Sequence, residues 1–169
     1  MKNWIFFCVA GLFALHTSMG HANVLSSDVL KWQMQSKEHG SITSFLGNGS
    51  RAMYEVTKLD YPRLMFILSY SDCPLTPEGQ LFDEEDPLTI NQTEITIQIA
   101  CINGSTLALV PANKLEMEKA TKAFLLAKTS YLYWRSNQAI TAFHGTQFNY
   151  IKSMVDLEHA QQAFKRKYQ

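Results

Sequence analysis

The sequence predicts an α+β fold: a single domain built on a mainly antiparallel sheet of about six or seven strands, with two or three helices including a C-terminal helix. Runs with period-two alternation of apolar residues fall mainly between positions 41 and 110. Two Asn-Gly dipeptides, at Asn48 and Asn103, connect such runs as hairpin turns do. Apolar residues at helical spacing come later in the chain, and strands followed by helices are typical of α+β proteins.

The first 22 residues have the pattern of a cleaved signal peptide. Lys2 precedes an apolar run from position 4 to 15, and small residues precede a cleavage position after Ala22. The run is too short to span a hydrocarbon core of about 30 Å. We therefore expect residues 1–22 to be removed and residues 23–169 to form one soluble domain in the periplasm or outside the cell.

Composition excludes two function classes. The chain has 15 basic and 15 acidic residues, and loss of Lys2 leaves the exported domain with one more acid than base. No basic excess exists to follow a nucleic-acid backbone, so we expect no nucleic-acid partner. No second long apolar run follows the signal peptide, so we expect no integral membrane segment after its cleavage.

Two cysteines, Cys73 and Cys101, follow the signal peptide. In an oxidising compartment an even pair usually forms a disulfide, so this pairing is predicted. Closing a loop of just under thirty residues contributes about 3–4 kcal/mol to stability in the chain-entropy account. Two free buried thiols are the alternative that the sequence leaves open.

The first segment of the exported domain is ambiguous between helix and strand. Leu30, Trp32 and Met34 alternate with polar residues as in a strand, whereas residues 26–28 are suitable to cap a helix. Few β-branched residues occur between positions 25 and 37. We favour a helix there by a small margin.

Three predicted strands and a long loop follow. Residues 41–46 and 51–59 are predicted strands joined at Asn48-Gly49, and residues 63–70 are apolar on both faces, as in a central strand. Residues 71–91 contain three prolines and are predicted to form a loop of about twenty residues. Loops of this length are often functional.

The strongest strand pattern covers residues 93–102. Ile95, Ile97, Ile99 and Cys101 fall on one face of it. The turn at Asn103-Gly104 then leads into a returning strand at 106–110.

Two helices and two further strands complete the expected elements. Residues 113–128 place Met117, Ala120, Phe124 and Ala127 on one helical face. Residues 130–135 and 139–144 are predicted strands, and the aromatic run 131–134 is interpreted as a strand with one face in the core. Residues 156–168 form the last predicted helix, with Asp156 as N-cap, an apolar face at Leu157, Ala160, Phe164 and Tyr168, and cations at 165–167 near its C-terminus.

The candidate partner-binding residues lie in the long loop: Phe82, Asp83, Glu84, Glu85 and Asp86. An aromatic side chain flanked by charges is a common contact pattern in protein interfaces. A solvated acidic loop is the alternative. The four acids lack the ligand spacing of a calcium loop and no zinc-ligand spacing occurs, so we expect no metal and no cofactor.

Three histidines remain after signal cleavage: His39, His144 and His159. His39 precedes a turn, and His159 is expected on the exposed face of the last helix. His144, at the end of a strand, has a setting that suits a catalytic base. No nucleophile elbow accompanies it, so we expect no catalytic residues and no enzyme activity. Sequons at Asn48, Asn91 and Asn103 mark surface positions that glycosylation would use in a eukaryotic source.

These observations favour a non-enzymatic periplasmic or secreted binding protein. The leading hypothesis is an inhibitor or immunity protein that binds another protein, such as a toxin or hydrolase. The alternative is an accessory component of an envelope assembly that serves secretion, conjugation or adhesion. A hydrolase with a site near His144 is the second alternative.

Overall fold

The computed structural model describes residues 31–70, 80–135 and 138–168 of the 169-residue chain. The predicted signal peptide lies outside these ranges. Within them the elements follow in this order: β1 (Gln33–Met34), β2 (His39–Thr43), β3 (Arg51–Glu55), β4 (Arg63–Ser69), β5 (Phe82–Asp83), β6 (Leu88–Ile90), β7 (Thr93–Ile95), β8 (Ile97–Asn103), β9 (Thr106–Pro111), α1 (Lys114–Leu126), β10 (Thr129–Tyr133), β11 (Ala139–His144) and α2 (Phe148–Tyr168).

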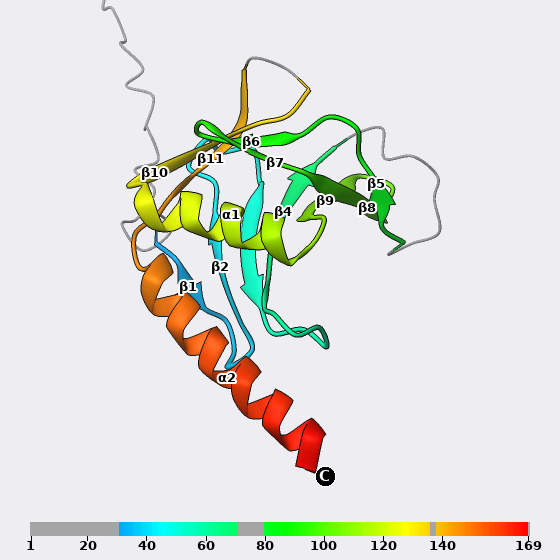
Figure 1. The fold of residues 1–169 in the computed structure, drawn as a ribbon. Coiled ribbons are helices and arrows are strands. Elements are labelled where there is room, and N and C mark those ends of the chain that lie inside the picture. The colour runs from blue at the N-terminus through cyan, green and yellow to red at the C-terminus, as the bar shows by residue number, and fades with distance from the viewer. Residues whose placement is uncertain (1–30, 71–79, 136–137, 169) are drawn as a thin grey trace, which may run out of the picture.

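The described strands form two antiparallel sheets. The larger has seven strands in the order β1-β2-β3-β4-β9-β8-β5, and the smaller has four in the order β11-β10-β6-β7. Figure 1 shows α1 lying across the strands and α2 running along the β1–β2 side. The predicted α+β class is confirmed, with two helices of which one is C-terminal. The division into two sheets was not expected from the sequence.

The main core lies on one face of the larger sheet. The ring of Phe66 in β4 packs 5.7 Å from Phe124 of α1 and 6.3 Å from Phe143 of β11, measured between centroids. On the same face, Tyr54 of β3 lies 5.6 Å from Phe148 of α2. Both helices and the smaller sheet therefore share this core, and β4 is the central two-sided strand that its sequence predicted.

The opposite face of the larger sheet carries a second, smaller apolar cluster. Its members come from β3, β4, β8 and β9: Met53, Met65, Ile67, Ala100, Ile102, Ala108 and Val110. The polar Arg51 lies on this face beside Ile67, its register partner in β4. The two apolar faces explain why the β4 sequence shows no alternation.

The strand predicted at 93–102 is divided at Thr96. Its first part, β7, joins the smaller sheet, and its second part, β8, joins the larger one. The Thr96 amide donates to Glu116 Oε2 at 3.0 Å, and the Thr96 carbonyl accepts from Ala112 at 2.9 Å. Both polar groups of the Thr96 backbone thus bind the segment that begins α1.

Glu116 is suited to this role by its place in the first turn of α1, where a carboxylate is favoured. Burial alone would raise its pKa, but hydrogen bonds from Lys119 and Thr96 outweigh burial and leave the pKa below its usual value. Asn113 caps the same turn by accepting from the Glu116 amide at 3.1 Å. The helix predicted at 113–128 is confirmed.

The β8–β9 hairpin is confirmed, and β2 and β3 pair as predicted, but the tight turn at Asn48-Gly49 is wrong: residues 44–50 form a longer connection that the Ser44 amide closes by donating to the Ser50 carbonyl. Gly47 and Gly49 both have φ of 71°, which glycine adopts without steric cost. The three sequon asparagines use their side chains in hydrogen bonds within the fold: Asn48 donates to the Ile140 carbonyl, Asn91 accepts from the Tyr131 amide, and Asn103 accepts from the Ser105 amide. Each of these asparagines therefore has a structural role in the fold.

The small preference for a helix over residues 25–37 is wrong where the structure describes this segment. β1 pairs with β2 through Gln33 and Met34. Trp32 is fully buried, its ring lies 4.7 Å from Phe148, and its amide donates to the Thr146 carbonyl at 3.1 Å. This tertiary packing favours the strand that the alternation of Leu30, Trp32 and Met34 had indicated.

The predicted unstructured loop at 71–91 is also wrong in part. β5 pairs with β8 through Phe82 and Ile99, and β6 pairs with both β7 and β10. Strands of two or three residues are too short to give a periodic signal. Residues 71–79 lie outside the described ranges.

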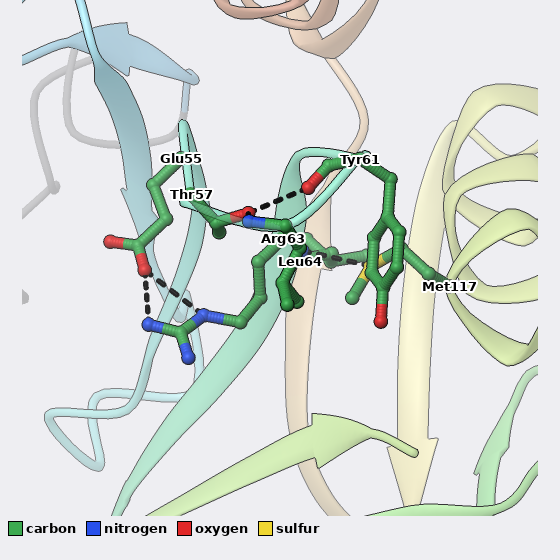
Figure 2. A network of polar contacts seen from close by, with 7 residues as sticks. Glu55, Thr57, Tyr61, Arg63, Leu64 and Met117 are labelled. Carbon is green, nitrogen blue, oxygen red and sulfur yellow. Dashed lines mark hydrogen bonds and ion pairs between the residues drawn. The ribbon is translucent and has the colours of Figure 1, made fainter. Parts of the chain in front are cut away.

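The connection between β3 and β4 is fixed by polar contacts, shown in Figure 2. Arg63 Nε donates to Glu55 Oε1 at 3.0 Å across the two strands, and the Thr57 hydroxyl donates to the Tyr61 carbonyl at 2.7 Å. The Leu64 amide donates to Met117 Sδ at 2.9 Å, which joins β4 to α1. This ordered turn places Tyr61 beside the helices.

Candidate protein-binding surface

The C-terminal helix begins eight residues before the position that the sequence predicted. The Phe148 amide donates to the Gly145 carbonyl at 3.1 Å, and Gln147 has a positive φ of 68°. Gly145 is required at this corner, because a Cβ there would lie 2.3 Å from the Ala127 carbonyl oxygen. Asp156 is consequently inside the helix, and its predicted role as N-cap is wrong.

The buried face of α2 is formed by Phe148, Ile151, Val155 and His159. Ile151 packs so closely on Gly40 of β2 that a Cβ at Gly40 would lie 2.3 Å from Ile151 Cγ2. His159 is buried and its Nε2 donates to the Leu59 carbonyl at 2.9 Å. The predicted exposed position of His159 is therefore wrong.

The face predicted to be buried, formed by Leu157, Ala160, Phe164 and Tyr168, is instead exposed, and Tyr150 and Met154 extend its apolar surface toward the start of the helix. Tyr150, Met154, Leu157, Phe164 and Tyr168 are 59, 41, 55, 65 and 66 % exposed. With the exposed Gln161 they follow one line along the helix, and we refer to these six residues as the outer stripe. Their successive separations of 4, 3, 4, 3 and 4 residues are those of a heptad repeat.

A helix that covers one sheet face usually has a single apolar side and a polar opposite side. α2 has two apolar sides, since the outer stripe lies opposite the buried face. Single exposed apolar residues are normal on protein surfaces, but a contiguous stripe marks an interaction site. At 1.5 Å per residue, the 21 residues of α2 extend this surface over about 31 Å.

The end of α2 combines aromatic and basic side chains. The Phe164 and Tyr168 rings lie 4.6 Å apart, and Lys165, Arg166 and Lys167 occupy the last turn. In Figure 1 this end projects past the strands. Arg166 donates to the Thr57 carbonyl at 3.4 Å, which holds the projecting end against the β3–β4 connection.

A cleft of about 360 Å³ separates α2 from α1 and the β3–β4 connection. At its base, the Tyr54 hydroxyl donates to Asp156 Oδ1 at 2.8 Å, and Lys152 forms an ion pair with the other carboxylate oxygen. Burial, followed by the charge and hydrogen bond of Asp156, raises the pKa of Tyr54 far above its ordinary value. Because the Tyr54 hydroxyl keeps its proton, it continues to donate this hydrogen bond, which connects the cleft to the sheet.

The five candidate partner-binding residues, at positions 82 to 86, do not share one exposed surface. Phe82 is half-buried in β5, and Asp83 accepts from Gln98 Nε2 at 2.9 Å. Glu84 is buried and forms an ion pair with Arg135. Glu85 and Asp86 are exposed. Three carboxylates, those of positions 83, 85 and 86, therefore face solvent around the ion pair of the buried Glu84 with Arg135.

Arg135 organises this acidic segment, and sequence reasoning did not identify it. It has a positive φ of 56°, its guanidinium lies 4.3 Å from the Trp134 ring centroid, and its Nε lies 3.4 Å from Asp86 Oδ2. The hydrogen bond to Glu84 raises the pKa of Arg135 although partial burial opposes this. Several contacts thus stabilise a backbone conformation that is uncommon for a non-glycine residue.

His144 has no catalytic arrangement around it in the described part of the chain. The Phe45 ring stacks on it at 4.5 Å, and Thr129 Oγ1 lies 3.4 Å from its Nδ1. No described carboxylate forms an ion pair with it. His39, in β2, contacts Ser36 Oγ through Nδ1 at 3.0 Å. The geometry adds no support to the hydrolase alternative.

Cys101 is buried in β8 on the core side that the alternation predicted. Cys73 lies outside the described residues, so the disulfide between them stays a prediction. Among the residues in the described ranges, no three His, Cys, Asp or Glu side chains gather as metal ligands would. No helix in the same ranges is both long and apolar enough to cross a membrane.

No protein-family model, no curated protein and no solved structure matches this chain.

The outer stripe was visible in the sequence as a heptad pattern from Tyr150 to Tyr168, but half of it was assigned to the core. Buried and exposed faces of one amphipathic pattern cannot be told apart when both are apolar. Had the sequence analysis placed the start of the helix at Phe148, the second apolar face, at Phe148, Ile151 and Val155, would have been recognisable.

Proposed function

We propose that this chain is a non-enzymatic, exported binding protein that acts by forming a complex with another polypeptide. The outer stripe of α2 is the observation that carries the proposal. The stripe is presented on a firm support, because the opposite face of α2 is packed on β2 and β3.

The energy available at the stripe supports this function. Burial of apolar surface contributes about 25 cal/mol per Å², so each of the five large apolar side chains supplies on the order of 1–2 kcal/mol when a partner covers it. Amphipathic helices bind through anchors at this i, i+4, i+7 spacing. The stripe is suited to contact an apolar helix or groove rather than a small molecule.

As the finer role we propose an inhibitor or immunity protein, supported by the acidic segment. The exposed carboxylates of Asp83, Glu85 and Asp86 flank the Glu84–Arg135 ion pair, and Asp86 also pairs with Arg135. A rigid negative surface loses little conformational freedom on binding and speeds association with a basic cleft. A toxin or hydrolase with such a cleft is the proposed target.

An accessory component of an envelope assembly is the second candidate. The length of the outer stripe favours it, since a surface that runs along a whole helix is suited to permanent packing between subunits. This candidate predicts stoichiometric recovery with a large complex, whereas an inhibitor is recovered with a single target.

Site-specific photo-crosslinking in the native host tests the proposed function. A photoreactive residue replaces Leu157 on the outer stripe, and the matched control carries it at the exposed Gln92, remote from α2 in the β6–β7 turn. We expect a covalent complex from position 157 and none from position 92. Equal capture from both positions, or no capture from position 157, would refute the proposal.

The finer role has its own test. Asp83→Asn, Glu85→Gln and Asp86→Asn remove three charges while preserving side-chain shape, and Glu84 is kept to retain the ion pair with Arg135. We expect this variant to fold normally but to recover less of a basic target from the exported fraction. Unchanged recovery of every co-purifying protein would exclude the acidic segment as a contact.

A further inference from the structure

We propose that the outer stripe of α2 packs against the same stripe of a second copy of this chain, with the two helices antiparallel. The inference rests on the proposed function, because it names the polypeptide that occupies the surface already described.

The spacing of the stripe is suited to antiparallel pairing in one register. When the two helices are centred on position 159, Tyr150 meets Tyr168, Met154 meets Phe164 and Leu157 meets Gln161 of the other copy. All six stripe positions are then covered in both chains. A slip by one heptad in either direction leaves two stripe residues of each chain without a stripe partner, so the centred register buries the most apolar surface.

Charge selects the antiparallel direction over the parallel one. Parallel helices would bring the last turn of each copy, with Lys165, Arg166 and Lys167, against the same three cations. Antiparallel helices in the centred register offset these two groups by 14 residues, on the order of 20 Å. That separation is more than two Debye lengths at physiological ionic strength, so the repulsion is screened.

The area of the stripe is sufficient for a dimer of moderate affinity. Fully buried aromatic side chains contribute about 150–250 Å² each, and Tyr150, Phe164 and Tyr168 are about three-fifths or more exposed. Adding Met154 and Leu157 gives on the order of 500 Å² per copy, which reaches the total of about 1,000 Å² where specific interfaces begin. We therefore expect a concentration-dependent dimer.

Gln161 gives the stripe its single polar position. In the centred register it lies against Leu157 of the other copy, beside the two-fold axis. A polar residue in such a seam lowers affinity but restricts the register. Gln161→Leu should therefore tighten the dimer by about tenfold or more, a gain that a merely structural role would not produce.

Light scattering of the purified chain across a concentration series tests self-association. We expect the mass to rise toward that of a dimer in the wild type, to rise at lower concentration in Gln161→Leu, and to stay monomeric in Leu157→Glu. Gln92→Glu, an exposed control, should match the wild type. A monomeric wild type at all concentrations up to about 1 mM would overturn the proposal.

Cysteine crosslinking tests the direction. Met154→Cys mixed with Phe164→Cys should form a disulfide-linked dimer under oxidation, because these positions oppose each other. Met154→Cys alone should not, since ten residues place its two copies about 15 Å apart, beyond the reach of a disulfide. Efficient crosslinking of Met154→Cys alone would overturn the antiparallel arrangement.

The two proposals fail in different ways. If the chain is monomeric and the photoreactive residue at position 157 captures a different protein, the second copy is excluded and the proposed function stands. If position 157 captures nothing and the chain is monomeric, both are excluded.

Discussion

The Tyr54 hydroxyl donates to Asp156 Oδ1 at 2.8 Å and thereby connects the third strand to the C-terminal helix across 102 residues of sequence. Tyr54 is almost fully buried, and Asp156 also pairs with Lys152. This contact helps to set how α2 lies on the sheet, and with it the direction in which the outer stripe faces.

Removing this hydroxyl should destabilise the fold. Tyr54→Phe leaves one oxygen of a half-buried carboxylate without its donor, which costs about 1–3 kcal/mol. Urea unfolding followed by circular dichroism measures the loss. Tyr150→Phe removes an exposed hydroxyl and should leave stability within about 0.5 kcal/mol. Equal effects of the two substitutions would contradict the role given to Tyr54.

The raised pKa of Tyr54 predicts a pH dependence. In the unfolded chain tyrosine loses its proton near pH 10, whereas folded Tyr54 keeps it, so its contribution is intact below about pH 10 and is lost as pH rises further. Wild-type stability should fall faster than that of Tyr54→Phe between about pH 10 and 11.5, by up to about 1.4 kcal/mol per pH unit. Parallel slopes for the two proteins would exclude the shift.

Loss of Arg135 should leave a buried charge without its partner. Glu84 retains 5 % side-chain exposure, so Arg135→Ala is expected to destabilise the fold by about 2 kcal/mol, reduced from the fully buried case because Arg135 is 44 % exposed. Thermal unfolding measures this. Lys128→Ala, an exposed control on a turn, should have little effect, and a similar small effect at Arg135 would contradict the anchoring role.

Gly145 and Gly104 form a matched pair. A Cβ at Gly145 would lie 2.3 Å from the Ala127 carbonyl oxygen, whereas a Cβ at Gly104 meets nothing within 4 Å. Gly145→Ala should cost about 2 kcal/mol or more, since backbone must move at the start of α2. Gly104→Ala should unfold close to the wild-type temperature. If Gly145→Ala also unfolds close to that temperature, the close approach of Gly145 to Ala127 does not restrict this position.

The predicted disulfide has a direct test. Non-reducing mass spectrometry of the exported chain should give a peptide that links Cys73 to Cys101. Reduction should lower stability by about 3–4 kcal/mol. Detection of both cysteines as free thiols in the oxidised sample would leave the two-thiol alternative.

Local chemistry made several elements predictable. The hairpin around Asn103-Gly104 and the helix capped by Asn113 follow from turn and capping residues that act within a few positions, and both are confirmed. The apolar run of β4 also predicted correctly that this strand is covered on both faces. In these segments local preference and tertiary packing agree.

The elements that sequence reasoning missed depend on distant contacts. β5 and β6 have two and three residues and exist through pairing with β8, β7 and β10. The start of α2 depends on the close approach of Gly145 to Ala127. Leu157, Phe164 and Tyr168 of the outer stripe were predicted to face the core because their spacing is that of a packed helix, and only the tertiary structure distinguishes a covered face from an open one.

The division of one strand at Thr96 has a consequence for how the molecule opens. Because the Thr96 backbone is bonded to both Ala112 and Glu116, neither sheet can separate from the other without freeing the start of α1. Amide protons of β7 and β8 should then exchange with solvent through the same opening event, at one common free energy, although they belong to different sheets. The chain should melt in a single calorimetric transition, with both sheets lost together.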